Sequence, residues 1–120
     1  MIYHFLTMSD PATYLPLSPA VFHILLALAD EDRHGYAIMR DIEQRTDGVV
    51  RVGPGMLYGS IKWLVEDGLI EEVPRRRGGD DRRRAYRLTP SGRALLKAEA
   101  SRLASAVALA RTRRVLAKKA

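Results

Sequence analysis

Apolar residues recur at helical spacing in several segments of the chain, and each segment is bounded by residues that start or stop helices. The first segment begins with Ser18 as an N-cap and Pro19 at the first helical position, and it continues to about Ala29. Its residues are apolar on nearly all sides, which predicts a central, buried helix. A second helix is expected over about residues 35–46, because an apolar face there is followed by the helix-stopping Gly48.

The third predicted helix opens at Pro54 and ends before Gly68, a residue type that favours the left-handed position after a helix. Its core-facing residues follow the spacing i, i+4, i+7, i+8. They are Leu57, Ile61, Leu64 and Val65. The other face has few side chains, because Gly55 and Gly59 occupy it. Each glycine costs a helix about 1 kcal/mol relative to alanine, so we expect compensation by close approach of the backbone to a partner; close packing of another helix is the alternative.

Residues 70–73 and 84–88 are typical of two short strands joined by a turn at residues 78–81. Thr89 is the expected N-cap of a last helix, which runs from Pro90 to about Lys118. The order of the elements predicts a mainly α fold with a small β-hairpin: a winged helix-turn-helix followed by a long C-terminal helix.

The last predicted helix is longer than a compact domain of this size requires. Apolar residues recur along it at alternating spacings of four and three, as they do at the contact seam of a coiled coil. This seam comprises Leu96, Ala100, Leu103, Val107 and Ala110. We expect homodimerisation through the seam; the alternative is that the helix folds back on the first helix, and both contacts can coexist.

The chain has 120 residues, which is enough for one domain with a modest core. We divide it into an N-terminal extension (residues 1–17), a winged helix-turn-helix DNA-binding domain (residues 18–89) and a C-terminal dimerisation helix (residues 90–120).

Charge is distributed unevenly along the chain, whose formal net charge is +6. Residues 1–74 contain five Lys/Arg and eleven Asp/Glu, whereas residues 75–120 contain fifteen Lys/Arg and three Asp/Glu. A basic half of this kind is typical of a protein with a polyanionic partner, because each neutralised phosphate releases counterions. A basic surface that only maintains solubility is the alternative.

Arginines flank the predicted turn between the two strands. They are Arg75, Arg76, Arg77, Arg82, Arg83, Arg84 and Arg87. A guanidinium group can bind phosphate in a bidentate fork or enter a narrow minor groove. Asp80 and Asp81 partly neutralise the turn, so we do not expect every arginine to contact DNA at once. Together with the bare third helix, this hairpin predicts binding to double-stranded DNA.

The N-terminal part of the third helix is expected to enter the major groove. Tyr58 and Lys62 are candidates for phosphate or base-edge contacts, and Gly55 and Gly59 permit the close approach. The helix contains no Asn, Gln or Arg, so sequence reading must rely also on DNA shape and on the hairpin. A winged-helix module that binds RNA or another protein without operator specificity is the rival interpretation.

Other classes of function lack support in the sequence. The absence of cysteine excludes a disulfide scaffold and a thiolate metal site, and the three histidines lack metal-ligand spacing. We find no nucleophile elbow, phosphate loop or paired acid and base, so we expect no enzyme activity, catalytic residue, metal or cofactor. The apolar start of the chain is too short for a signal peptide or a membrane span, which predicts cytoplasmic residence without a membrane partner.

Three segments together resemble the PadR family of bacterial transcriptional regulators, especially its short members with one C-terminal helix. These segments are residues 34–38 (HGYAI), residues 55–58 (GMLY) with 68–70 (GLI), and residues 83–92 (RRAYRLTPSG). With the first helix, the resemblance covers about residues 16–110. It implies a homodimer that binds an inverted-repeat operator and usually represses. It also implies a possible small effector, commonly aromatic or phenolic, that lowers operator affinity.

The resemblance also places Tyr36, Tyr58 and Lys62 at positions associated with the DNA face or its support, and the hairpin arginines at backbone contacts. The chain departs from the family at Met56, where threonine is common, and this removes a hydroxyl group able to bond phosphate. Met56 could instead touch a thymine methyl group. Gly53 and Gly59 stand where serine and proline are common, which leaves the fold intact but changes the individual contacts.

Overall fold

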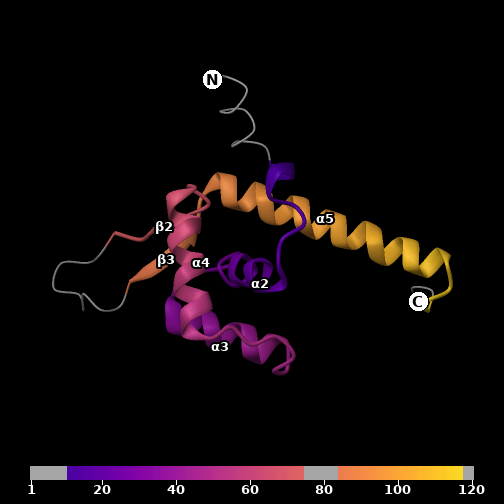
Figure 1. The fold of residues 1–120 in the computed structure, drawn as a ribbon, viewed down its shortest axis with the longest axis horizontal. Helices are drawn as coiled ribbons and strands as arrows, with labels where there is room; N and C mark the ends of the chain where they lie inside the picture. The colour runs from indigo at the N-terminus through magenta and orange to yellow at the C-terminus, as the bar shows by residue number, and fades with distance from the viewer. Residues whose placement is uncertain (1–10, 75–83, 118–120) are drawn as a thin grey trace, which may run out of the picture.

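The computed structural model describes residues 11–74 and 84–117 and confirms the predicted fold class (Figure 1). The elements in chain order are η1 (Pro11–Tyr14), α2 (Pro19–Ala27), β1 (Arg33–His34), α3 (Gly35–Arg45), α4 (Pro54–Glu66), β2 (Ile70–Glu72), β3 (Ala85–Leu88) and α5 (Pro90–Thr112). Helices α3 and α4 form the helix-turn-helix, and β2 and β3 form the base of the wing.

Helices α2 and α5 begin at the predicted cap residues. The Ser18 side chain accepts a hydrogen bond from the Val21 amide at 3.2 Å, and the Thr89 hydroxyl accepts one from the Gly92 amide at 3.0 Å. Gly68 follows α4 with a φ of +73°, the left-handed conformation expected just after a helix.

Helix α5 is shorter than predicted. We expected it to reach about Lys118, but its last helical residue is Thr112. Arg114 adopts a φ of +62°, and the Val115 amide donates back to the Ala110 carbonyl at 2.9 Å. A helix that ends with such a hydrogen bond usually has glycine in the left-handed position. Because arginine occupies that position here, the sequence carried no stop signal.

The sheet has three strands in the order β1-β3-β2, all antiparallel. Strand β1 was not predicted, since two residues cannot show an alternating pattern. It pairs Arg33 with Tyr86, while β2 pairs Ile70 with Leu88. The predicted turn and Arg75, Arg76, Arg77, Arg82 and Arg83 lie outside the described residues.

The hydrophobic core lies among α2, α3, α4 and the first turns of α5. Its largest fully buried apolar side chains are Ile24, Leu25, Ile38, Ile42, Leu57, Leu64, Ile70 and Leu95. The prediction for α4 was wrong at Val65, which is exposed. At 100° per residue, Val65 lies about 80° around the helix from Leu57 and therefore falls at the edge of the buried face.

The start of α5 is joined directly to the end of α4. The Thr89 hydroxyl donates to the Gly68 carbonyl at 2.6 Å, and the Thr89 amide donates to the Leu69 carbonyl at 3.2 Å. A Cβ atom on Gly92 would lie 2.9 Å from the Leu69 carbonyl carbon, so only glycine fits there without a shift. Helices α4 and α5 therefore meet at a closely packed junction.

A second connection runs through residues 11–17, which lie along the first half of α5 (Figure 1). The Tyr14 ring stacks on Trp63 of α4 with centroids 6.3 Å apart, and its hydroxyl donates to Asp67 at 3.2 Å. Burial, with help from the Asp67 carboxylate, raises the pKa of Tyr14. The Leu17 amide donates to the buried carboxylate of Glu99 in α5 at 2.8 Å. This segment therefore links α4 to α5.

Candidate nucleic-acid interface

The outward face of α4 is bare of side chains at Gly55 and Gly59, and we call this part of the helix its bare face. A Cβ atom on Gly55 or on Gly59 would meet no other atom within 4 Å, so no helix in the described part of the chain packs on these glycines. Lys62 is exposed on the same face. Met56 is exposed too, and its sulfur accepts a hydrogen bond from the buried Ser60 hydroxyl at 3.7 Å. Another molecule can thus approach the α4 backbone closely.

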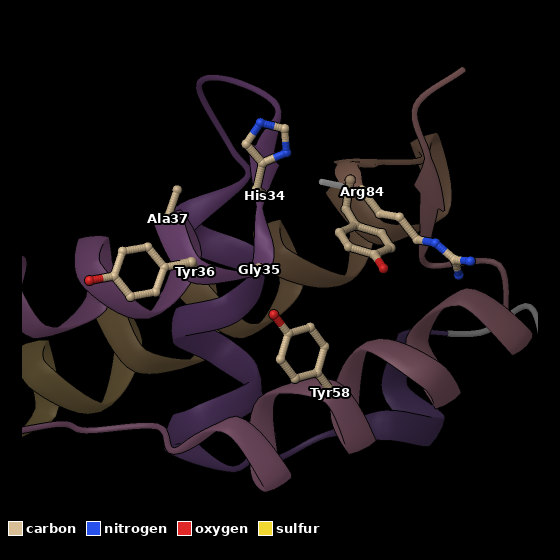
Figure 2. Close-up of a pocket in the computed structure, with 7 residues that line it drawn as sticks. His34, Gly35, Tyr36, Ala37, Tyr58 and Arg84 are labelled. Carbon is tan, nitrogen blue, oxygen red and sulfur yellow. The ribbon is translucent and has the colours of Figure 1, made fainter. Parts of the chain in front are cut away.

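A hollow of about 610 Å³ adjoins this face, between the start of α3, helix α4 and the sheet (Figure 2). It is lined by His34, Gly35, Tyr36, Ala37, Tyr58, Arg84 and Tyr86. His34 is the N-cap residue of α3, but its side chain makes no capping hydrogen bond. The start of a helix carries unpaired amide groups and a partial positive charge, which favour an anion.

Tyr58 connects α4 to the start of α3. A Cβ atom on Gly35 would lie 2.7 Å from the Tyr58 hydroxyl oxygen, so glycine makes room for this side chain. Figure 2 shows the hydroxyl group directed from α4 toward Gly35. The side chain nevertheless remains 50% exposed. Tyr58 can therefore donate a hydrogen bond to a ligand in the hollow.

Two arginines that the sequence analysis missed lie beside these elements. The guanidinium carbon of Arg40 is 5.9 Å from the ring centroid of the exposed Tyr36, a cation–π distance. Arg51 lies in the turn before α4, and both arginines line a groove of about 470 Å³ between that turn and α3. The i, i+4 spacing of Tyr36 and Arg40 on one helix was the available sequence signal.

The described arginines of the wing base are partly neutralised. Arg87 donates to Glu71 at 2.7 Å, and this bond raises the pKa of the Arg87 guanidinium. Arg84 is exposed, lies at the rim of the hollow and has its Nε atom 3.8 Å from the Glu72 carboxylate. Of the hairpin arginines, Arg84 and Arg87 lie within the described residues, and Arg84 is the one that borders the hollow.

Two arginines, Arg33 and Arg45, bond to other parts of their own chain. Arg33 donates to the Ala27 carbonyl at 2.6 Å and lies within ion-pair distance of Asp30, Glu31 and Asp41. Arg45 donates to Asp41 at 2.7 Å. Arg40, Arg51 and Lys62, by contrast, have no carboxylate partner among the described residues. These three cations are therefore available to a partner, although the carboxylates of Glu43 and Glu66 line the same hollows.

The predicted dimer seam falls into two parts. Leu96 is buried in the core of its own chain. Ala100 is exposed, Leu103 and Val107 are 37% and 38% exposed, and Ala110 is half-buried. Figure 1 shows the second half of α5 extending beyond the other helices. The first half of α5 thus packs on its own domain, while the second half leaves apolar side chains uncovered.

Within residues 11–74 and 84–117, no group of three or more His, Asp or Glu side chains is placed to hold a metal ion. Over the same residues, none of the helices combines the length and apolar character that crossing a membrane requires.

Comparison with known proteins shows which family shares these features. A model of the transcriptional regulator PadR-like family matches residues 24–98. The chain is 42% identical over 81 residues to an uncharacterized 37.1 kDa protein in transposon TN4556 of Streptomyces fradiae, and 41% identical over 75 residues to the transcriptional regulator Rv3488 of Mycobacterium tuberculosis. The matches cover 68% and 62% of this chain. They span only 22% and 65% of the two relatives.

Solved structures share the fold. A transcriptional regulator from Clostridium thermocellum is 26% identical and aligns with a TM-score of 0.64, over 77% of this chain and 86% of that chain. Bacillus subtilis PadR, solved in complex with operator DNA, is 23% identical and aligns with a TM-score of 0.59, over 68% of this chain and 46% of that chain.

Proposed function

We propose, because this chain belongs to the transcriptional regulator PadR-like family, that it binds a double-stranded DNA operator as a homodimer and represses transcription. The family consists of regulators of transcription and not of enzymes. The observation that carries the proposal is the bare face of α4, where the backbone at Gly55 and Gly59 is open and the nearby cations lack carboxylate partners. That face suits a large polyanion with a groove wide enough for a helix.

In the proposed complex, the first turns of α4 enter the major groove and α3 crosses the phosphate backbone, as in other helix-turn-helix proteins. A phosphate group would occupy the hollow at the start of α3, where the helix dipole and the Tyr58 hydroxyl favour an anion. Tyr36 and Lys62 would bind neighbouring phosphates, and the wing arginines would bind the backbone alongside. The operator complex of Bacillus subtilis PadR, which shares this fold, supports such docking.

Dimerisation is proposed through the second half of α5. Its uncovered apolar side chains follow the spacing of a coiled-coil seam, and a second copy of the chain can bury them. The two recognition helices would then lie about 34–36 Å apart, one turn of DNA, on the two halves of an inverted repeat.

We extend the proposal to an effector: a small aromatic compound would bind between the two copies and lower operator affinity. The resemblance to the family supports this regulation. The structure adds that Leu26 of α2 is partly exposed and that Leu109 of α5 is exposed. Apolar side chains of this kind could line a cavity between two subunits.

The function is tested by titrating the protein into labelled duplex DNA from upstream of its own gene. A scrambled duplex of equal length and the corresponding RNA serve as competitors, and candidate aromatic compounds are added in a second series. Tighter binding to the upstream duplex supports an operator-specific regulator. Equal affinity for all three nucleic acids would instead favour the module without operator specificity.

The wing is tested by replacing four arginines with alanine together. These are Arg76, Arg77, Arg82 and Arg83. We expect weaker binding to all duplexes and a salt dependence that flattens by up to about one slope unit for each lost phosphate contact. Lys97→Ala combined with Arg113→Ala, which removes two positive charges from α5, is the control and should leave the slope unchanged. A quadruple variant with wild-type affinity and slope would show that the wing does not touch DNA.

A further inference from the structure

The side chains of α4 alone offer few ways to distinguish one base pair from another. Its first turns expose glycines, Met56 and Tyr58, and Lys62 follows with a flexible ammonium group; none of these has the planar two-donor fork with which arginine binds a guanine edge. Arginine, whose fork fits O6 and N7 of guanine, makes the most common specific contact in the major groove. An arginine close to the start of α4, on a neighbouring segment, would therefore add a base contact that α4 itself does not offer.

Arg51 is such a group. It lies two residues before Gly53, the N-cap of α4, and its side chain is exposed in the groove that it lines with Val52 and Gly53. Its Nη2 atom would be 3.3 Å from a Cβ atom on Gly48, so the guanidinium group rests over the turn between α3 and α4. The side chain thus starts beside the end of α4 that enters the groove in the proposed complex.

The charge of Arg51 is not used inside the protein. Arg33, Arg45, Arg87 and Arg102 are each bonded to a carboxylate, and each of them supports the scaffold. Arg51 forms no hydrogen bond or ion pair with the described residues. One carboxylate, Glu43, lines the same groove but is not bonded to Arg51. Both donors of the guanidinium fork therefore remain available to a base.

Arg40 lines the same groove, but its neighbours differ from those of Arg51. It belongs to α3, the helix that crosses the backbone, and its guanidinium group lies over the Tyr36 ring. This position suits a phosphate contact, whereas the position of Arg51 at the start of α4 suits a base edge. Resting on the proposed function, we infer that Arg51 reads a guanine in each half of the operator through O6 and N7, while Arg40 binds the backbone.

The experiment is a binding selection from a library of random duplexes, carried out with the wild type, Arg51→Ala and Arg40→Ala. We expect the wild type to enrich an inverted repeat with a G·C pair at one fixed position in each half. With Arg51→Ala, the preference for G·C at that position should fall about tenfold, while the preferences at the other positions stay unchanged. Arg40→Ala should keep the whole motif, bind all members more weakly and reduce the salt slope by about one.

The outcomes separate this assignment from the function on which it rests. A wild type that enriches no motif would overturn the proposed function and the assignment with it. If the wild type enriches a motif that Arg51→Ala leaves intact, only the role of Arg51 is overturned. Both arginines are exposed, and thermal melts of each variant show that any change in binding arises from a folded protein.

Discussion

If the bare face of α4 lies against DNA as proposed, one substitution should have opposite effects on folding and on DNA binding. Gly59 lies inside α4, and its backbone conformation is one that other residues adopt. Alanine in place of glycine inside a helix contributes about 1 kcal/mol, mainly by restricting the unfolded chain. The added methyl group would meet no atom within 4 Å, so nothing in the described structure offsets this gain.

We therefore expect Gly59→Ala to raise the free energy of unfolding of the free protein by about 1 kcal/mol. For a chain of this length, that corresponds to roughly 3–5 °C in Tm. In the complex, the same methyl group would stand between the α4 backbone and the DNA. We expect operator affinity to fall about tenfold, which corresponds to about 1.4 kcal/mol.

The assays are a thermal melt of the free protein and an anisotropy titration with the upstream duplex. Gly68→Ala is the control, because Gly68 has a φ of +73° and lies at the far end of α4. That variant should be destabilised by about 1 kcal/mol and should keep its DNA affinity once folded. If Gly59→Ala melts higher and still binds the duplex as tightly as the wild type, the backbone of α4 does not approach DNA at this position.

Three further substitutions test the rest of the structure. Gly92→Ala should destabilise the fold by about 1–3 kcal/mol in denaturant titrations, because its methyl group would collide with backbone at the junction of α4 and α5; wild-type stability would refute that packing. Leu103→Glu should yield monomers by sedimentation while Lys97→Glu, on the same helix, does not; a dimer that persists would place the interface elsewhere. Glu99→Gln should lower the free energy of unfolding at pH 7, because the hydrogen bond from Arg102 holds the folded-state pKa of Glu99 below its ordinary value of 4.5. The difference in this free energy between wild type and variant should shrink as the pH falls below 4.5. A difference that is constant with pH would contradict this role of the carboxylate.

Local signals in the sequence were sufficient to predict α2, α3, α4 and the start of α5, but not the short 3-10 helix η1. Ser18, Thr89 and Gly68 each act through their own backbone or through residues three or four positions away, so a linear reading finds them. Strand β1 depends instead on pairing with a strand some fifty positions later, and two residues carry no pattern of their own. The end of α5 was missed because Arg114 adopts a conformation that its side chain does not favour.

The candidate interface was predicted less completely than the fold. Gly55, Gly59, Tyr58 and Lys62 were found because they share one helix, whose periodicity shows which side chains lie together. Arg51 lies in a turn, where no periodicity applies, and only the folded chain reveals that it flanks the start of α4 without a carboxylate partner. The pairing of charges in three dimensions thus separates scaffold arginines from available ones, and composition alone cannot do so.

In the proposed dimer, the geometry of α5 would allow a few base contacts to give useful selectivity. Helix α4 is fixed to α5 at the Thr89–Gly92 junction and again through Tyr14 and Leu17, so the partner's position along α5 would determine the distance between the two recognition helices. If one guanine contact discriminates about tenfold, two copies held at a fixed spacing discriminate about a hundredfold, because separated contacts are roughly additive in free energy. An operator whose two halves have the wrong spacing would lose both tenfold factors at once. An effector that changed the packing of the two α5 helices by a small angle would therefore release the operator without touching α4.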